Sequence, residues 1–426
     1  MRTFVRILLN KHPMKDLIKK IPGALVTIIL LGGMIFLNTR QSHASFDYQN
    51  SNFSFFWLAG RMILEGENPY DQDQYLASHA TYGIEWQPNK IFPYPLPLAI
   101  FCIPLGFFSI ENAYILWTVI SLFITAGTIF ILLNQWKSSA HQRLLIPVFA
   151  FMLYFGPLYL TLHTGSIGAF ALLTILGAIL LLEKDKSLFA GIVLSLTLLK
   201  PPQGLTILLL AGIWFLARRD WKAILGVAIG GVSLLVIGMI QDPMWVIKFR
   251  GASEAVMDRT LGVHSNVWAF AYLICKGTSP CSTLLGGTFG LILLSLGGFF
   301  LWQAQPPVGN QPQGAAPAKV RAWEAFNVIL PIAFMSTIYL WAYDQLLYVI
   351  PIVWIVGMLV EKTKSYIYAF LFLIVLDLFS LFALAQQAAT EKDLWSLGTT
   401  ILVLGMVAGI PYLTPKKPME NKTPSD

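Results

Sequence analysis

Long apolar runs recur from one end of this chain to the other, and they constrain its fold more than any other feature. A helix needs about 20 mostly apolar residues to cross the hydrocarbon core of a bilayer, which is about 30 Å thick. We count twelve such runs, several of them short, and therefore predict an all-α bundle of about twelve transmembrane helices. The runs cover residues 21–38, 113–134, 144–162, 167–183, 187–200, 203–218, 223–241, 283–303, 326–342, 345–361, 366–385 and 395–413.

The composition agrees with a polytopic integral membrane protein. Hydrophobic residues make up 56% of the 426 residues and charged residues only 12%, whereas soluble domains carry about 25% charged residues. The net charge of +7 is ordinary for such a protein, because Lys and Arg collect in cytoplasmic loops. These values exclude a soluble enzyme and a nucleic-acid-binding protein, and they make membrane lipids the expected surroundings.

Basic residues orient the predicted spans. The N-terminal arm, residues 1–20, carries six Lys and Arg residues before the first run, so we place it in the cytoplasm. With twelve spans, the other basic connections and the C-terminus also fall on the cytoplasmic side. We divide the rest of the chain into a membrane module at 21–303, a linker at 304–325, C-terminal helices at 326–413 and a tail at 414–426.

One apolar stretch, residues 91–109, breaks the pattern. It contains Pro93, Pro95, Pro97 and Pro104, which are too many for a regular helix. Counting it as a crossing would move every later basic loop to the outside. We therefore predict a re-entrant or interfacial segment on the outer side, following a large outer loop at 39–90. Irregular backbone at membrane depth is tolerated only against protein or a water-filled cavity.

Polar residues near the predicted helix ends gather on the outer side. His163, Lys200, His264, Asp344 and Gln345 all lie there. Polar groups at membrane level are costly, which makes these residues functional candidates around an outward-facing cavity. Each also has a structural interpretation. Lys200 could extend to the lipid headgroups, the two histidines could be interfacial, and Asp344 or Gln345 could cap the next helix.

The common soluble motifs are missing. The chain has no Walker A sequence, no dinucleotide glycine fingerprint and no zinc-protease motif, so no bound cofactor or metal site is predicted. Dependence on a divalent metal is left open. The pairs Gly226/Gly230 and Gly286/Gly290 indicate close helix packing. Cys275 and Cys281 flank a short turn that we place outside, where a local disulfide and two free thiols are both compatible with the sequence.

Six segments of the chain form a recognisable series. They are NFSFFWLAGRMILEGENPYD at 52–71, FPYPLPL at 92–98, the Ala113-x-x-x-Trp117 pattern, HTGSIGAF at 163–170, SLFAGIVLSLTLLKPPQGL at 187–205 and YLWAYDQLLYVIPIV at 339–353. Taken in order, they resemble glycosyltransferase family 87, which comprises hexosyltransferases of the GT-C fold that depend on polyprenol-phosphate sugars. The resemblance runs from about residue 45 to residue 361.

The resemblance implies a GT-C-like membrane module at 21–303 in the plasma membrane, with its active site on the extracytoplasmic side. The implied donor is a hexose, with mannose favoured, on a polyprenyl phosphate. The implied acceptor is an extracytoplasmic glycolipid or glycan. A carboxylate would act as base in an inverting transfer, and cationic or polar groups would stabilise the departing phosphate. The candidates for contact with the substrate or its phosphate are Tyr94, His163, Lys200, Arg259, His264, Asp344 and Gln345.

The catalytic base is where the sequence departs from the family. The place of the family's loop aspartate, counted back from Ala59, is held by Asn52, which cannot act as a base. Asp47 lies five residues earlier, and we favour it as the base. The alternatives are an impaired enzyme, or a base supplied by another carboxylate such as Asp344.

Two other functions compete with glycosyl transfer. A lipid or glycolipid transporter or flippase would share the spans and the intramembrane polar groups, and a catalytically degenerate GT-C assembly subunit would fit Asn52. A transporter predicts polar residues near the bilayer midplane and an internal repeat, neither of which we see. The long outer loop and the polar groups at one rim favour a glycosyltransferase.

Overall fold

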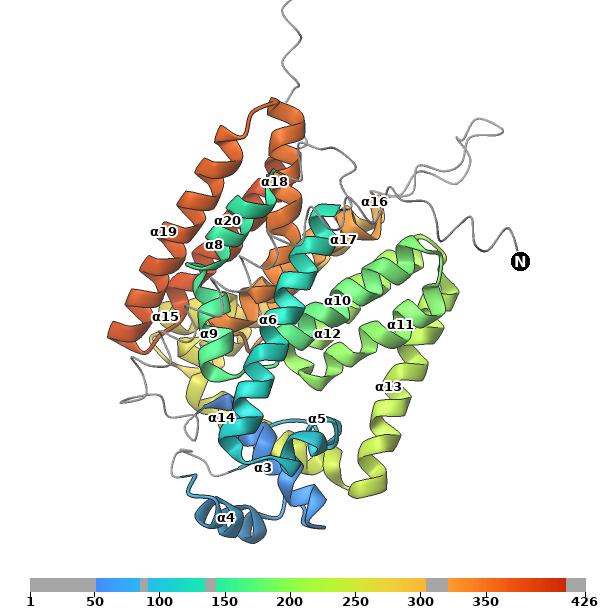
Figure 1. The fold of residues 1–426 in the computed structure, drawn as a ribbon, viewed down its shortest axis with the longest axis vertical. Coiled ribbons are helices and arrows are strands. Elements are labelled where there is room, and N and C mark those ends of the chain that lie inside the picture. The colour runs from blue at the N-terminus through green and yellow to red at the C-terminus, as the bar shows by residue number, and fades with distance from the viewer. Residues whose placement is uncertain (1–50, 85–90, 135–142, 304–320, 411–426) are drawn as a thin grey trace, which may run out of the picture.

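The computed structural model describes residues 51–84, 91–134, 143–303 and 321–410, apart from the side chains of Asp258 and Arg259. Within these ranges the regular structure is entirely helical (Figure 1). The elements are α3 (Asn52–Leu64), α4 (Gln72–Thr81), α5 (Leu96–Phe101), η2 (Ile103–Phe107), α6 (Ile110–Asn134), α8 (Leu145–Met152), α9 (Gly156–Thr164), α10 (Gly168–Glu183), α11 (Ser187–Ser195), η3 (Leu196–Leu199), α12 (Pro201–Ala217), α13 (Trp221–Gln241), α14 (Trp245–Thr260), η4 (Leu261–Val263), α15 (Val267–Ile274), α16 (Ser279–Gln303), α17 (Ala322–Ser336), η5 (Ala342–Tyr348), α18 (Val349–Thr363), α19 (Ile367–Thr390), η6 (Leu394–Ser396) and α20 (Leu397–Gly409).

Five of the described helices are long and apolar enough to cross a membrane. They are α6, α13, α16, the continuous pair η5–α18, and α19. The pair α8–α9 adds a sixth if its 55° bend lies within one span. Every predicted run from 113 onward coincides with a helix or helix pair, but five of these are only 10–17 residues long. The run at 21–38 and the N-terminal arm lie outside the described residues. The described residues therefore hold five or six helices of membrane-spanning length, and the number twelve stays a prediction.

The burial of the long helices indicates which of them face lipid. In the span Ala342–Thr363, 78% of the most apolar window is buried, so α18 lies at the centre of the bundle. In α13, α16 and α19 the corresponding shares are only 22%, 28% and 28%, and their exposed side chains are mostly Leu, Ile, Val and Phe. Water would penalise such surfaces, whereas hydrocarbon accepts them. The chain is therefore a membrane protein with a buried central helix.

The proline-rich stretch at 91–109 is irregular, as predicted. It forms the two short helices α5 and η2, which pack against α3. The helices touch through backbone at Gly60, where a Cβ atom would lie 2.5 Å from the carbonyl oxygen of Cys102. Cys102 itself is fully buried.

The described part of the predicted outer loop, residues 51–84, is helical, and its helix α3 packs against α4, α5 and η2. The helices α3, α4 and α5 gather at one end of the molecule, opposite the α18–α19 turn (Figure 1). Two contacts hold the Asn68–Asp71 turn in place. Asn68 Nδ2 donates to Asp242 Oδ2 at 2.7 Å, and the Tyr70 hydroxyl donates to the carbonyl oxygen of Tyr94. The loop is thereby fixed over the segment that carries Tyr94.

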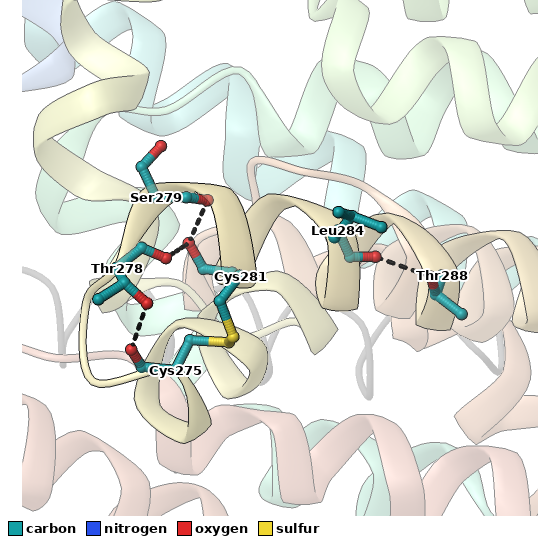
Figure 2. Close-up of a disulfide and its surroundings, with 7 residues drawn as sticks. Cys275, Thr278, Ser279, Cys281, Leu284 and Thr288 are labelled. Carbon is teal, nitrogen blue, oxygen red and sulfur yellow. Dashed lines mark hydrogen bonds between the residues drawn. A yellow bond between two sulfur atoms is a disulfide. The ribbon is translucent and has the colours of Figure 1, made fainter.

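The helical pair α15–α16 is closed by a disulfide between Cys275 and Cys281, with Cα atoms 5.6 Å apart. Figure 2 shows both cysteines at the tight turn, where the Thr278 hydroxyl also donates to the carbonyl oxygen of Cys275 at 2.7 Å. Of the two states that the sequence allows, the structure has the disulfide. The glycine pairs that were predicted to mark close packing do so, because a Cβ at Gly226 would lie 2.1 Å from the Leu188 carbonyl oxygen and one at Gly286 would lie 2.8 Å from the Trp268 ring.

Candidate functional site

Lys200 stands at a break between two apolar helices. The short helix η3 ends at Leu199, and Pro201 and Pro202 occupy the first turn of α12, so the backbone reverses at Lys200 with φ −129° and ψ 80°. Proline is well suited to this first turn, but it provides no N–H group. An anion at this helix end would therefore depend on side chains more than on backbone donors. The Lys200 side chain supplies a cation at this helix end, and it is only 8% exposed.

The anionic partner of Lys200 is Asp344, which lies 144 residues further along the chain in η5. The ammonium Nζ bonds to Asp344 Oδ1. The second carboxylate oxygen, Oδ2, accepts the backbone N–H of Trp341 at 3.0 Å and thereby caps η5. The Asp344 side chain is 2% exposed. Two opposite charges are thus held together out of contact with water, which is costly unless both are well partnered.

Aromatic side chains enclose this ion pair. Lys200 Nζ lies 4.6 Å from the ring centroid of Tyr343 and 5.9 Å from that of Tyr339, within the range of cation–π attraction. The side chain of Asn52, at the start of α3, lies within hydrogen-bonding reach of the Tyr343 side chain. Tyr94 lies near Tyr339 and Asp344, and burial holds the pKa of its hydroxyl well above the usual range. Helix α3 and the proline-rich segment therefore approach the ion pair through Asn52 and Tyr94, respectively.

His264 forms the next wall. Its ring meets Tyr339 and Trp341 edge-on, with centroid separations of 4.5 and 5.1 Å, and its Nε2 lies 3.1 Å from the Thr260 hydroxyl. Burial, with a smaller contribution from the charge of Lys200, lowers the pKa of His264 to about 3. The imidazole is consequently neutral at physiological pH and can donate or accept a single hydrogen bond at its free nitrogen.

A second buried carboxylate, Asp393, supports the site from behind. Its Oδ2 accepts the backbone N–H of Ala342 at 2.7 Å, and its own backbone N–H donates to the carbonyl oxygen of Val263 at 2.7 Å. Asp393 thereby connects η5 to η4, which directly precedes His264. Burial raises the pKa of Asp393 to about 7.

Two cavities meet at Lys200. The larger, about 190 Å³, lies between α5, α6, α10 and α12 and is lined almost entirely by apolar side chains, with Lys200 and Gln203 at its polar end. Three of its lining residues, Phe101, Leu173 and Leu196, are 40–51% exposed on the outer surface of the bundle. It therefore opens sideways, toward lipid. The smaller cavity, about 50 Å³, lies against α14 and is lined by Tyr94, Lys200 and Tyr339.

Five of the predicted site residues thus come together: Asn52, Tyr94, Lys200, His264 and Asp344. They come from α3, the proline-rich segment, the α12 start, the η4–α15 connection and η5, so the cluster unites five separate regions of the sequence. Their roles and their side of the membrane remain predictions, but the structure brings them together around Lys200.

Two predicted residues make other contacts. His163 lies in the last turn of α9, and its ring stacks on that of Tyr159 with a centroid separation of 5.5 Å. Gln345 turns toward α20, where its Nε2 donates to the Ser396 carbonyl oxygen at 2.8 Å. This geometry favours helix docking for Gln345. Asp47 and the side chain of Arg259 lie outside the described residues.

Three further members of the cluster are Gln203, Tyr339 and Tyr343, which the sequence analysis did not include among the candidates for substrate contact. Gln203 is buried, and its amide lies within hydrogen-bonding reach of the Asp344 carboxylate, although Nε2 falls short of ideal hydrogen-bond geometry. Its position three residues after Lys200, at a helix start, was the available signal. The two tyrosines alternate with Trp341 before Asp344, which could have indicated an aromatic enclosure.

Comparison with known proteins gives one match. The model described as glycosyltransferase family 87 matches residues 92–322, a little over half of the chain. The matched region contains Tyr94, Lys200 and His264, whereas Asp344 follows it. No curated protein and no solved structure matches.

Proposed function

Because the chain belongs to glycosyltransferase family 87, it is a membrane glycosyltransferase, and we propose that its donor is a hexose carried on a polyprenyl phosphate. Mannose is the proposed hexose, and an extracytoplasmic glycolipid or glycan is the proposed acceptor. The proposed site of action is the outer face of the plasma membrane. The family match agrees with the resemblance predicted from the sequence over residues 92–322.

The observation that carries this proposal is the position of Lys200 at the polar end of an apolar cavity. A polyprenyl phosphate has the same two parts, a long hydrocarbon chain and a small anionic head. The sideways opening near Phe101 and Leu173 would let the chain enter from the bilayer, and the cavity would hold its first part. The ammonium of Lys200 would then meet the phosphate. A nucleotide sugar has no hydrocarbon to place in such a cavity.

The chemistry of transfer assigns Lys200 to the leaving-group side. As the acceptor hydroxyl attacks the anomeric carbon, the bond to the phosphate oxygen breaks and negative charge grows on the phosphate. A fixed cation in a water-poor site stabilises that charge strongly. Tyr343 and Tyr339 would keep the ammonium in place through their ring faces.

The same chemistry argues against Asp344 as the catalytic base. In an inverting displacement the nucleophile and its base lie across the sugar ring from the leaving group. Asp344 bonds directly to Lys200 and therefore lies on the phosphate side. The base must come from the opposite side, and we keep Asp47 of the outer loop in that role. Asn52, which reaches Tyr343, is the position through which the loop approaches the site.

A first experiment tests the donor. Purified protein in lipid nanodiscs receives labelled polyprenyl-phosphate mannose and an acceptor glycolipid extract, with and without EDTA, and transfer is counted. We expect transfer by the wild type and a loss of about 100-fold or more in Lys200→Met. Lys184→Met is the matched control, because Lys184 lies exposed in the α10–α11 turn. Transfer from a nucleotide sugar alone, or equal activity in Lys200→Met, would refute the proposal.

A second experiment tests the base. Asp47→Asn and Asn52→Asp are assayed under the same conditions. Loss of transfer in Asp47→Asn, with the protein still folded, would support Asp47. Transfer that appears only in Asn52→Asp would show that the natural chain is a degenerate enzyme. If Asp47→Asn retains full activity, the base lies elsewhere.

A further inference from the structure

Lys200 already has an anion bound to it. In the structure its ammonium is bonded to Asp344, and both side chains are almost completely buried. A donor phosphate that approaches along the apolar cavity would reach an ammonium whose charge is already matched. The resting ion pair and a bound phosphate are therefore in competition for the same cation.

The two partners differ in their freedom to move. Asp344 is anchored, because its Oδ2 accepts the Trp341 N–H at 3.0 Å and closes the cap of η5. Lys200 has a flexible four-carbon stem and borders both cavities. The rings of Tyr343 and Tyr339 provide cation–π contact over several positions of the ammonium. If the pair opens, the lysine moves and the carboxylate stays.

Gln203 is positioned to replace Lys200 as the hydrogen-bond donor to the Asp344 carboxylate. It is 4% exposed, and its amide lies within hydrogen-bonding reach of the Asp344 carboxylate, although Nε2 falls short of ideal hydrogen-bond geometry. A buried carboxylate that loses its cation needs another donor, and this amide is a neutral donor beside it. Since Gln203 follows Lys200 by three residues in the first turn of α12, both side chains reach the same carboxylate.

We propose that Asp344 occupies the phosphate position on Lys200 in the empty enzyme, that donor phosphate takes Lys200 over, and that the Nε2 of Gln203 then donates to Asp344. The inference rests on the proposed polyprenyl-phosphate donor. Asp344 is thus a positioning residue that acts through Lys200. It keeps the buried ammonium neutralised until a lipid phosphate arrives, and it returns to it after the phosphate leaves.

This exchange predicts that removing Asp344 strengthens, rather than weakens, the binding of a lipid phosphate. If Asp344 were a direct substrate ligand, its removal would weaken binding of the lipid phosphate. If Asp344 is a competitor, its removal tightens binding. The apparent affinity of a site that is open for a fraction of the time is reduced by that fraction. With Lys200 free in less than about a tenth of the empty molecules, removing the competitor should lower Kd by about tenfold or more.

The test measures binding of a labelled polyprenyl phosphate without sugar to the full chain in nanodiscs. The variant is Asp344→Asn, whose amide oxygen can still accept the Trp341 N–H. The matched control is Asp393→Asn, a second buried aspartate that also caps η5, through Ala342, but has no contact with Lys200 among those described. Lys200→Met reports whether binding uses the ammonium. Thermal unfolding with and without the lipid is recorded for each protein.

Four outcomes decide the matter. Tighter binding by Asp344→Asn, together with a larger lipid-induced rise in Tm than in wild type and no change in Asp393→Asn, supports the exchange. Weaker or equal binding by Asp344→Asn, with Lys200-dependent binding by wild type, overturns the exchange but leaves the donor proposal standing. Equal tightening in Asp393→Asn also overturns it, because a general loosening of η5 would then be the cause. Failure of wild type and Asp344→Asn alike to bind refutes the donor proposal and the exchange together.

Discussion

Removing the charge of Lys200 should destabilise the protein strongly, and removing both charges should restore most of the loss. Lys200→Met leaves the Asp344 carboxylate 2% exposed without its cation. Breaking a buried ion pair from one side costs about 3–5 kcal/mol. The Trp341 N–H remains bonded and Gln203 is within reach, so we expect a loss of about 3 kcal/mol, at the lower end of that range. The double variant Lys200→Met/Asp344→Asn has no buried charge and keeps the cap, and we expect it to lie within about 1 kcal/mol of wild type.

The assay is a double-mutant cycle measured by thermal unfolding in one detergent at a fixed scan rate. The scan rate is held constant because membrane proteins often unfold irreversibly. Glycosyl transfer is recorded on the same samples, and it should stay absent in the double variant although stability returns. Single variants as stable as wild type would show that the pair is not buried in solution. A double variant whose loss equals the sum of the single losses would show that the two charges do not interact.

Three further predictions concern other parts of the fold. Gly60→Ala places a methyl group 2.5 Å from the carbonyl oxygen of Cys102, and it should lower the free energy of unfolding by about 1–3 kcal/mol and reduce transfer activity. Gly127→Ala on α6, where the added methyl group meets open space, is the control. It should leave unfolding and activity unchanged or slightly improved. Because the folded pKa of Asp393 is raised to about 7, folding favours its protonated form, so its contribution to stability is present at acidic pH and falls as pH rises toward 7. Asp393→Asn should remove this part of the pH dependence, roughly 4 kcal/mol in full, and a flat difference between variant and wild type from pH 5 to 8 would contradict it. Reduction of Cys275–Cys281, which closes a loop with a sequence separation of 6, should cost about 2 kcal/mol, checked by Tm with and without reductant and by alkylation of the two thiols.

Much of the helical layout could be predicted from the sequence, because an apolar run specifies a helix locally. The irregular backbone at 91–109 followed from its prolines, and the packing at Gly226 and Gly286 followed from glycine spacing. The number of crossings could not be predicted in the same way. Residues 187–200 were predicted as one span, and they form a helix followed by a 3-10 turn, Ser187–Leu199, which is shorter than a full span and ends at Lys200.

The candidate site could be predicted as a set of residues but not as an arrangement. Lys200 and Asp344 were both identified, each for its own cost at membrane level. Their pairing was not, because it joins residues 144 apart and depends on how α12 and η5 pack. Gln345 was grouped with Asp344 because the two are adjacent, but in the 3-10 geometry of η5 their side chains diverge. Asp344 faces Lys200, and Gln345 faces α20.

The last helices have a consequence for how this protein can be shortened. Asp393 caps Ala342, and Ser396 and Thr400 hold Gln345, so the segment that carries Asp344 is fastened by residues near the end of the described chain. A protease cut after α19, or a truncation there, would leave most of the bundle intact and still release η5. The segment from Asp393 through α20 thus holds in place the site around Lys200, which lies nearly two hundred residues earlier in the chain. A shortened enzyme must keep this segment to remain active.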